Sequence, residues 1–180
     1  MKTYFTSDLH FYHKNVLKFE NRPFNTIEEM NEGLIEKWNN KVNEEDKVYI
    51  LGDFSFARVT KTVEILRRLK GKKYLILGNH DSDKIYKSKT IRDEFELITN
   101  YYELKDENIV LFHYPIAVWN NMHHNSIHLF GHIHSNTSTL HQLKYIEDNS
   151  YNVGVDVNNY EPCTLEEIIE NNKVWRENNE

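Results

Sequence analysis

Five short apolar runs, each followed at once by polar residues, constrain the fold of this 180-residue chain more than any other feature. A short apolar run bounded by turn residues is typical of a buried strand. Stretches with helical periodicity separate the first three runs, and strands that alternate with helices are typical of layered α/β proteins. The expected strands are Lys2–Ser7, Val48–Leu51, Tyr74–Leu77, Ile109–Phe112 and Ile127–Phe130.

Helical periodicity and capping residues predict three helices and one further strand. Thr26 precedes the first helix and Glu29 follows three residues later, which is the spacing of a capping box, and Thr164 with Glu167 repeats this spacing. No stretch rich in Pro, Gly or Ser divides the chain, so we expect one domain over residues 1–180 with an α/β (α+β) architecture. The expected helices are Thr26–Val42, Val59–Leu69 and Thr164–Trp175, and the late strand is Tyr151–Val155.

The polar residues after the five runs are expected to meet at one edge of the sheets. Ligands bind at strand ends in α/β proteins because rigid strands position the loop residues there. In Asp8-Leu9-His10 and Gly131-His132-Ile133-His134, two polar side chains two positions apart share a face if the segment is extended. The glycines before Asp53, Asn79 and His132 permit tight turns and close approach of the backbone.

The residue types in these clusters are those that bind transition metals. They comprise two carboxylates, one amide and four imidazoles, which suit Mn²⁺, Fe, Co²⁺, Ni²⁺ or Zn²⁺ better than Ca²⁺ or a soft metal. The one cysteine, Cys163, excludes an internal disulfide and a zinc site built on cysteines. Seven side chains are too many for one tetrahedral ion but fit two adjacent ions that share a carboxylate. The seven are Asp8, His10, Asp53, Asn79, His113, His132 and His134.

The order of these motifs is similar to that of the calcineurin-like metallophosphoesterase superfamily, in its small single-domain bacterial and phage form. Asp-x-His, Gly-Asp, Gly-Asn-His-Asp, His and Gly-His-x-His follow one another between Asp8 and His134. The tail from Asn152 to Ile169, with its Gly154-Val155-Asp156 segment, also resembles small members. The resemblance covers nearly the whole chain, and it implies a four-layer α/β/β/α sandwich of two mixed β-sheets.

The resemblance assigns the seven donors to two divalent metal ions, with Mn²⁺ expected first and Fe, Ni²⁺, Co²⁺ or Zn²⁺ as alternatives. It implies that His80 is the catalytic histidine, which would contact a phosphoryl oxygen and protonate the leaving group. The nucleophile would be a metal-bridging hydroxide. Asp53 would bridge the two ions. The first ion would be held by Asp8, His10, Asp53 and His134, and the second by Asp53, Asn79, His113 and His132.

The expected activity is hydrolysis of phosphate esters, with a phosphodiester slightly preferred. Two divalent ions, two carboxylates and a hydroxide leave about one positive charge, which suits a diester monoanion and does not exclude a monoester. A phosphomonoesterase acting on a nucleotide or a phosphoprotein is the first alternative, and a metal-binding scaffold without catalysis is the second. The protein-phosphatase pattern is not matched, because Phe54–Arg58 replaces its Asp-Arg-Gly segment and Asp81 replaces its Glu after the histidine.

Several polar residues outside the seven are weaker candidates for a functional role. His13 and Arg58 are candidates for substrate binding, with a surface-loop role for His13 and a solvated position before a helix for Arg58 as the alternatives. Asp81 is a candidate for orienting His80 or a metal ligand. The remaining predictions are a plain loop for His123-His124, structural roles for His128 and His141, and inert packing for Cys163.

Charge and composition restrict the partners of the protein. Lys and Arg number 22 against 28 Asp and Glu, and the net charge of −6 argues against stable binding to duplex nucleic acid or to an anionic membrane. The sequence has no run of 18 apolar residues and no apolar segment after Met1 typical of a signal peptide, so a cytoplasmic protein is expected. The expected substrate is a small molecule or nucleotide that carries a phosphate ester, and the oligomeric state stays open.

Overall fold

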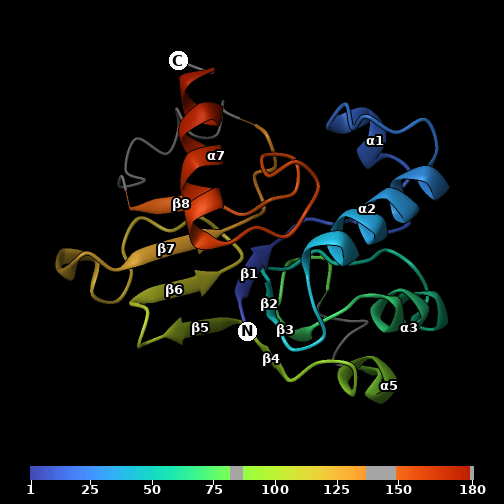
Figure 1. Cartoon of the computed structure of the whole chain (residues 1–180), viewed down its shortest axis with the longest axis horizontal. Coiled ribbons are helices and arrows are strands. Elements are labelled where there is room, and N and C mark those ends of the chain that lie inside the picture. The colour runs from blue at the N-terminus through green and yellow to red at the C-terminus, as the bar shows by residue number, and fades with distance from the viewer. Residues whose placement is uncertain (82–86, 137–148, 179–180) are drawn as a thin grey trace.

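Two four-stranded β-sheets with helices on their outer sides form the computed structural model, which describes residues 1–81, 87–136 and 149–178 (Figure 1). The strand order is β1-β2-β3-β4 in the first sheet and β5-β6-β7-β8 in the second. This arrangement confirms the predicted layered α/β fold. The strands are β1 (Thr3–Thr6), β2 (Lys47–Ile50), β3 (Lys72–Ile76), β4 (Leu97–Thr99), β5 (Tyr101–Leu104), β6 (Ile109–Phe112), β7 (Ile127–Phe130) and β8 (Ser150–Asn152). The helices are α1 (Val16–Phe19), α2 (Ile27–Lys41), α3 (Val59–Arg68), α5 (Lys89–Arg92) and α7 (Leu165–Glu177), with a 3₁₀ turn η1 (Met122–His124).

The two sheets differ in the direction of their strands. All pairings in the first sheet are parallel, because β1 connects to β2 through α2 and β2 connects to β3 through α3. In the second sheet β5 is antiparallel to β6, and the other pairings are parallel. Both sheets were expected to contain parallel and antiparallel strands, but only the second sheet does. Thr6 pairs with Ile50 and Ile50 with Leu75, so β1, β2 and β3 end at a common edge.

Both faces of the first sheet are buried, as the alternation of side chains along its strands requires. Val48 and Ile50 of β2 pack with Trp38 of α2 in the core between the sheet and its helices. Tyr49 and Leu51 point the other way and pack with residues of β6 and β7 in the core between the two sheets. Each strand is therefore held from both sides, and the residues that follow its carboxyl end start from a fixed position.

The C-terminal helix α7 lies against the second sheet, on the side away from α2 and α3 (Figure 1). Thr164 and Glu167 form the predicted capping box at its start. Asn172 of α7 is buried, and its side chain accepts from Asn152 N at 2.7 Å and donates to Asn152 O at 2.8 Å. Because these bonds dock α7 on β8, the segment that follows β8 has a fixed path toward the carboxyl edge of the sheets.

The elements that sequence analysis did not predict are short and poorly buried. β4 and β5 expose part of nearly every side chain, and α1 and α5 are four-residue helices. The strand expected at Tyr151–Val155 is shorter and ends at Asn152, because the chain then crosses to β1, where Val155 N donates to Ser7 O at 3.1 Å. None of the described helices has both the length and the apolar composition needed to cross a membrane.

Candidate metal centre

The five polar clusters lie directly after β1, β2, β3, β6 and β7, as the sequence analysis predicted. Since β1, β2 and β3 are parallel to one another and β6 is parallel to β7, each sheet carries its clusters at a single edge. A β-bridge between Ser7 and Gly154 joins the end of β1 to the segment after β8. The two sheet edges that carry the clusters are therefore adjacent. The structure brings all seven expected donor residues into this region.

Asp8, His10 and His134 form the first donor group. His10 Nε2 lies 3.2 Å from His134 Nε2, and each of these nitrogens lies 3.9 Å from Asp8 Oδ1. Burial, reinforced by neighbouring positive groups, lowers the pKa of His10 well below its usual range, so this ring is neutral. Burial also opposes a charge on His134, but its hydrogen bond to Asp156 and the charge of Asp8 raise its pKa to about 9. The two ring nitrogens thus face each other and Asp8 Oδ1 at one point of the site.

The backbone of the Asp8-Leu9-His10 and His132-Ile133-His134 segments is not extended, contrary to the expectation from sequence. Asp8, His10, His132 and His134 have φ values of 55°, 52°, 72° and 51°, in the left-handed region. In both motifs the residue between the two polar ones, Leu9 or Ile133, is buried in a hydrophobic cluster. In each motif the two polar residues have left-handed backbone and the apolar residue between them points into the core. As a result, both polar side chains face the site. Asp and His tolerate this conformation better than most residues, but it still costs on the order of 1–3 kcal/mol each.

Asn79, His113 and His132 form the second donor group. Asn79 Oδ1 lies 3.0 Å from His113 Nε2 and 3.0 Å from His132 Nδ1. His113 is fully buried, and its Nδ1 lies 2.7 Å from Leu51 O, which accepts a hydrogen bond from that nitrogen and leaves Nε2 to face Asn79. Asn79 itself is exposed and His132 is half-buried, so this group opens to solvent more than the first group does.

Asp53 stands between the two groups. Its Oδ2 lies 3.8 Å from His10 Nε2 and 3.8 Å from His113 Nε2, and its Oδ1 accepts from His80 N at 3.0 Å. Burial raises the pKa of Asp53 and the nearby Asp8 adds to this effect, while His113 opposes it. A carboxylate so placed needs positive charge close by to remain ionised.

Asp81 holds the turn that presents Asp53. Its Oδ2 accepts hydrogen bonds from Asp53 N at 2.6 Å and Gly78 N at 3.1 Å, and its Oδ1 accepts from Phe54 N at 3.0 Å. Of the two roles considered for Asp81, these bonds place it on the backbone of Asp53 rather than on the ring of His80. Burial raises the pKa of Asp81, and its three backbone donors counteract that effect.

Glycines let the loops approach one another closely. Gly52 has a φ of 88°, and a Cβ on it would lie 2.6 Å from both the Gly78 backbone and His113 Nδ1. A Cβ on Gly131 would collide with Ser7 Oγ and Asp8 Oδ2. Only glycine fits at these two positions, so the close approach predicted for the glycines of the clusters is confirmed there.

His80 and His13 lie beside the two groups. The His80 side chain is 48% exposed, with Nε2 4.0 Å from Asp53 Oδ2. His13 stacks on Phe56 with ring centroids 4.0 Å apart and lies 5.4 Å from the His10 ring, while Phe56 lies 4.8 Å from the His80 ring. Arg58 is exposed at the start of α3, where it is the N-cap residue. His80 and His13 thus border the donor groups, whereas the contacts of the described residues do not link Arg58 to them.

The donor geometry fits divalent ions. Two donors bound about 2.1 Å from a common ion at tetrahedral or right angles lie about 3.0 to 3.4 Å apart, and three of the contacts above fall at 3.0 to 3.2 Å. Asp8 Oδ1 is buried and accepts no hydrogen bond from any described residue, although it faces His10 and His134. A buried carboxylate oxygen without a donor is costly, and a cation between Asp8 and the two rings would satisfy it.

Two residues at the site escaped the sequence analysis. The side chains of Arg22 and Asp156 are buried, and Arg22 Nε donates to Asp156 Oδ1 at 2.8 Å. Asp156 Oδ2 accepts from His134 Nδ1 at 2.8 Å. The Gly154-Val155-Asp156 segment stood out as a resemblance, and its place after a late strand is the signal that could have identified Asp156. Arg22 carries no comparable local signal.

The structure buries His128 and Cys163, as expected for structural residues, and places His123 and His124 in a short 3₁₀ turn where a plain loop was expected. His128 is buried in β7 between Val110 O and Tyr114 O, and burial lowers its pKa to about 4. His123 and His124 are exposed in η1, and Cys163 is buried as a free thiol whose pKa burial raises to about 11. His141 lies outside the described residues.

Comparison with known proteins identifies the family. The model of the calcineurin-like phosphoesterase superfamily domain matches residues 1–150. The chain therefore belongs to the calcineurin-like phosphoesterase superfamily, whose members are hydrolases of phosphate esters that generally bind divalent metals. This confirms the resemblance drawn from the order of the motifs.

Individual relatives match this chain to different extents. An uncharacterized protein of Methanocaldococcus jannaschii is 35% identical over 180 residues, which span 97% of this chain and 95% of that protein. The Gene 66 protein of Mycobacterium phage L5 is 39% identical over 82 residues, covering 44% of this chain and 39% of the phage protein. A crystal structure of a protein of unknown function from Aquifex aeolicus superposes with a TM-score of 0.70 at 26% identity, covering 93% and 97% of the two chains.

Proposed function

We propose that this chain is a phosphoesterase that depends on two divalent metal ions and hydrolyses phosphate esters, with a phosphodiester preferred over a monoester. The observation that carries the proposal is the position of Asp53. Its Oδ2 lies 3.8 Å from a histidine nitrogen of each donor group, so a single carboxylate adjoins both groups. Two ions that share one carboxylate form a clamp suited to displacement at phosphorus.

The proposed ligands follow the two groups. Asp8, His10 and His134 would hold the first ion, Asn79, His113 and His132 the second, and Asp53 both. Nitrogen and oxygen donors without sulfur favour Mn²⁺, with Fe, Ni²⁺, Co²⁺ and Zn²⁺ as alternatives. Such ions supply positive charge to the phosphoryl oxygens and make water a nucleophile near neutral pH.

His80 is proposed as the general acid. Its ring is half-exposed and adjoins Asp53, and its backbone is tied to the same carboxylate, so it can reach a substrate without being needed as a ligand. Protonation of the leaving oxygen is work for which a histidine is well suited. His13 is proposed to contact the substrate from its place beside His10, and Arg58 to contribute a positive charge from the start of α3.

Two features support a phosphodiester of small-molecule or nucleotide size. Two divalent ions opposite the carboxylates of Asp8 and Asp53 and one hydroxide leave about one positive charge, which matches the single charge of a diester. The second donor group is open to solvent, which gives a small substrate direct access.

The test compares bis-nitrophenyl phosphate with nitrophenyl phosphate as substrates of the Mn²⁺-loaded protein. We expect hydrolysis that disappears on chelation, with a higher kcat/KM for the diester. A higher value for the monoester would replace the proposal with a phosphomonoesterase. A protein that binds two ions yet hydrolyses neither ester would be a metal-binding scaffold, and the proposal would be wrong.

A further inference from the structure

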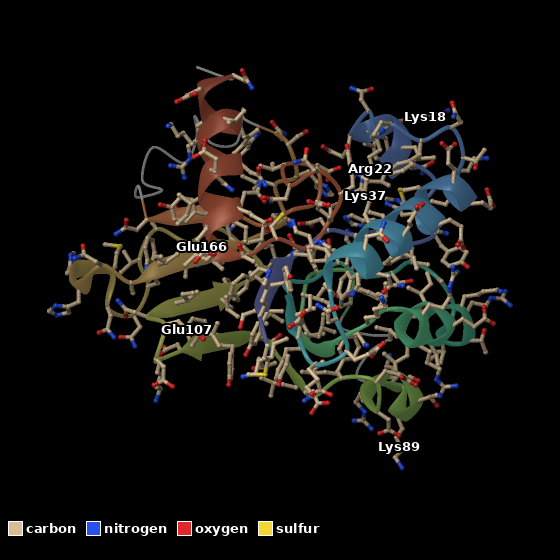
Figure 2. All side chains as sticks on the ribbon, viewed as in Figure 1. Lys18, Arg22, Lys37, Lys89, Glu107 and Glu166 are labelled. Carbon is tan, nitrogen blue, oxygen red and sulfur yellow. The ribbon has the colours of Figure 1, made fainter. Side chains whose placement is uncertain are left out.

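Arg22 is a buried arginine that the proposed reaction does not use. It lies between α1 and α2, is 4% exposed, and points toward the loop that precedes α7 (Figure 2). Its guanidinium donates two hydrogen bonds to the Asp156 carboxylate, from Nε to Oδ1 at 2.8 Å and from Nη2 to Oδ2 at 3.0 Å. A buried charge is tolerated only when charged partners and hydrogen bonds compensate the loss of water. The partners of Arg22 therefore show which segments it holds in place.

One set of bonds fixes the loop after β1. Arg22 Nη2 donates to Asp8 O at 2.7 Å and Nη1 donates to Leu9 O at 2.9 Å. These carbonyls belong to the peptide groups that join Asp8 to His10, both of which are left-handed. Strained backbone of this kind persists only where neighbouring groups hold it, and Arg22 supplies two such contacts.

The other set of bonds fixes His134. Asp156 Oδ2, held by Arg22, accepts from His134 Nδ1 at 2.8 Å, which leaves His134 Nε2 to face His10 Nε2 at 3.2 Å. A carboxylate on the remote nitrogen of a metal-binding histidine fixes its tautomer and orientation. A single guanidinium therefore connects the two chain segments, 124 residues apart, that carry the first donor group.

Glu20, His134 and Asp156 also approach one another closely enough to suggest a further ion. The contacts argue against one. Both oxygens of Asp156 are bound by Arg22, whose positive charge opposes a cation there, and Glu20 Oε2 accepts from Ser135 Oγ at 2.9 Å. The cluster is better explained as support for His134.

We infer that Arg22 and Asp156 are positioning residues that set the geometry of the first donor group, and thereby the affinity for one of the two ions. The inference rests on the proposed metal centre. Two of the three donors of the second group are supported without this pair, because His113 is oriented by Leu51 O and Asn79 follows β3. His132 is the exception, since its N donates to Asp8 Oδ2 at 2.9 Å. Loss of the pair should therefore weaken one ion and spare the other.

The test measures Mn²⁺ stoichiometry and affinity by calorimetry for Arg22→Lys and Asp156→Asn. Lysine keeps the positive charge of Arg22 but cannot form the two parallel hydrogen bonds of a guanidinium. Asparagine keeps the shape of Asp156 but not its negative charge. Lys37→Met is the matched control, since Lys37 donates to Asn159 O at 2.6 Å and lies 5.8 Å from the Tyr160 ring, which Arg22 also approaches at 5.9 Å. Lys37 is thus bonded to the same loop (Figure 2), and none of its hydrogen bonds to described residues involves a donor loop.

We expect each test variant to lose roughly 10–100-fold in affinity for one ion, with the other ion and the control unchanged. Visible spectra of the Co²⁺-loaded proteins should change for that one ion only. Equal loss at both ions, or no loss, would overturn the inference, and if Arg22→Lys fails to fold, Asp156→Asn decides it. A wild-type protein that binds two ions but hydrolyses no ester would contradict the proposed function alone, whereas one that binds no ion would contradict both.

Discussion

The two donor groups differ in how the protein supports them. In the first group Asp8 and His10 are buried and the His134 side chain is 18% exposed. Arg22 and Asp156 connect the two loops of this group through hydrogen bonds of 2.7 to 3.0 Å. The second group has one fully buried member, His113, and an exposed one, Asn79. A site whose donors are already held in place loses less conformational freedom when it binds an ion. In the proposed metal centre, the first group would therefore retain its ion more strongly, and the second would leave its ion open to substrate.

Replacement of Asp53, the residue common to both groups, should have the largest effect. Asp53→Asn removes the charge that offsets the repulsion between two cations, so the protein should lose more than one equivalent of metal or nearly all turnover, roughly 10³-fold or more. Metal analysis after gel filtration and steady-state kinetics measure this. Asp46→Asn is the matched control, because Asp46 is a buried carboxylate at the other end of β2 that accepts from Lys2 N and Asn43 N. Two tightly bound ions with a normal rate in Asp53→Asn would refute the shared role.

His80→Ala should lower kcat by roughly 10²–10⁴-fold while metal content stays intact. The loss should be greatest for an alkoxide leaving group and smaller for nitrophenolate, which departs without a proton. The exposed His123 provides the control, as His123→Ala should change neither quantity. Equal deficits for the two leaving groups would make His80 a phosphoryl-oxygen ligand instead of the acid.

His132→Ala and His134→Ala separate the two groups directly. Each removes one donor, so each should weaken one ion by about 100-fold or more, beyond the effect of losing a supporting residue. The ions should differ, because His132 adjoins Asn79 and His134 adjoins His10. Calorimetric titration of the two variants should leave different residual sites. Identical residual binding in both variants would show that the two histidines serve a single ion.

His128, a histidine outside both groups, should affect stability alone. Its pKa of about 4 in the folded protein lies below the unfolded value of about 6.5, so the unfolded chain binds more protons between these pH values. The contribution of His128 to the free energy of unfolding is therefore fully present above about pH 6.5. It falls by about 3 kcal/mol as the pH drops to 4. His128→Gln should flatten this part of a urea-unfolding profile and leave metal binding unchanged. An unaltered slope would assign the pH dependence to other groups.

The sequence predicts the strand-end clusters well because the signal for each is local. The apolar runs before Asp53 and Asn79 are continuous, and burial on both faces of a parallel sheet favours such runs. Gly52 is likewise a local signal, because only glycine allows its backbone to lie so close to Gly78 and His113. β4 and β5 escaped prediction because partly exposed strands at the sheet edges need no continuous apolar run.

What the sequence does not reveal are the features that depend on distant parts of the chain. The pairing of Arg22 with Asp156 joins residues 134 positions apart, so no local pattern announces it. The left-handed backbone at His132 and His134 is imposed by the burial of Ile133 and by the contacts around it, and alternation of polar residues alone wrongly predicted an extended segment.

Anomalous diffraction from crystals of the Mn²⁺-loaded protein tests the central claim most directly. We predict two peaks roughly 3.5–4 Å apart, one against Asp8, His10 and His134 and the other against Asn79, His113 and His132, with Asp53 touching both. A single peak, or two peaks that do not share Asp53, would contradict the account.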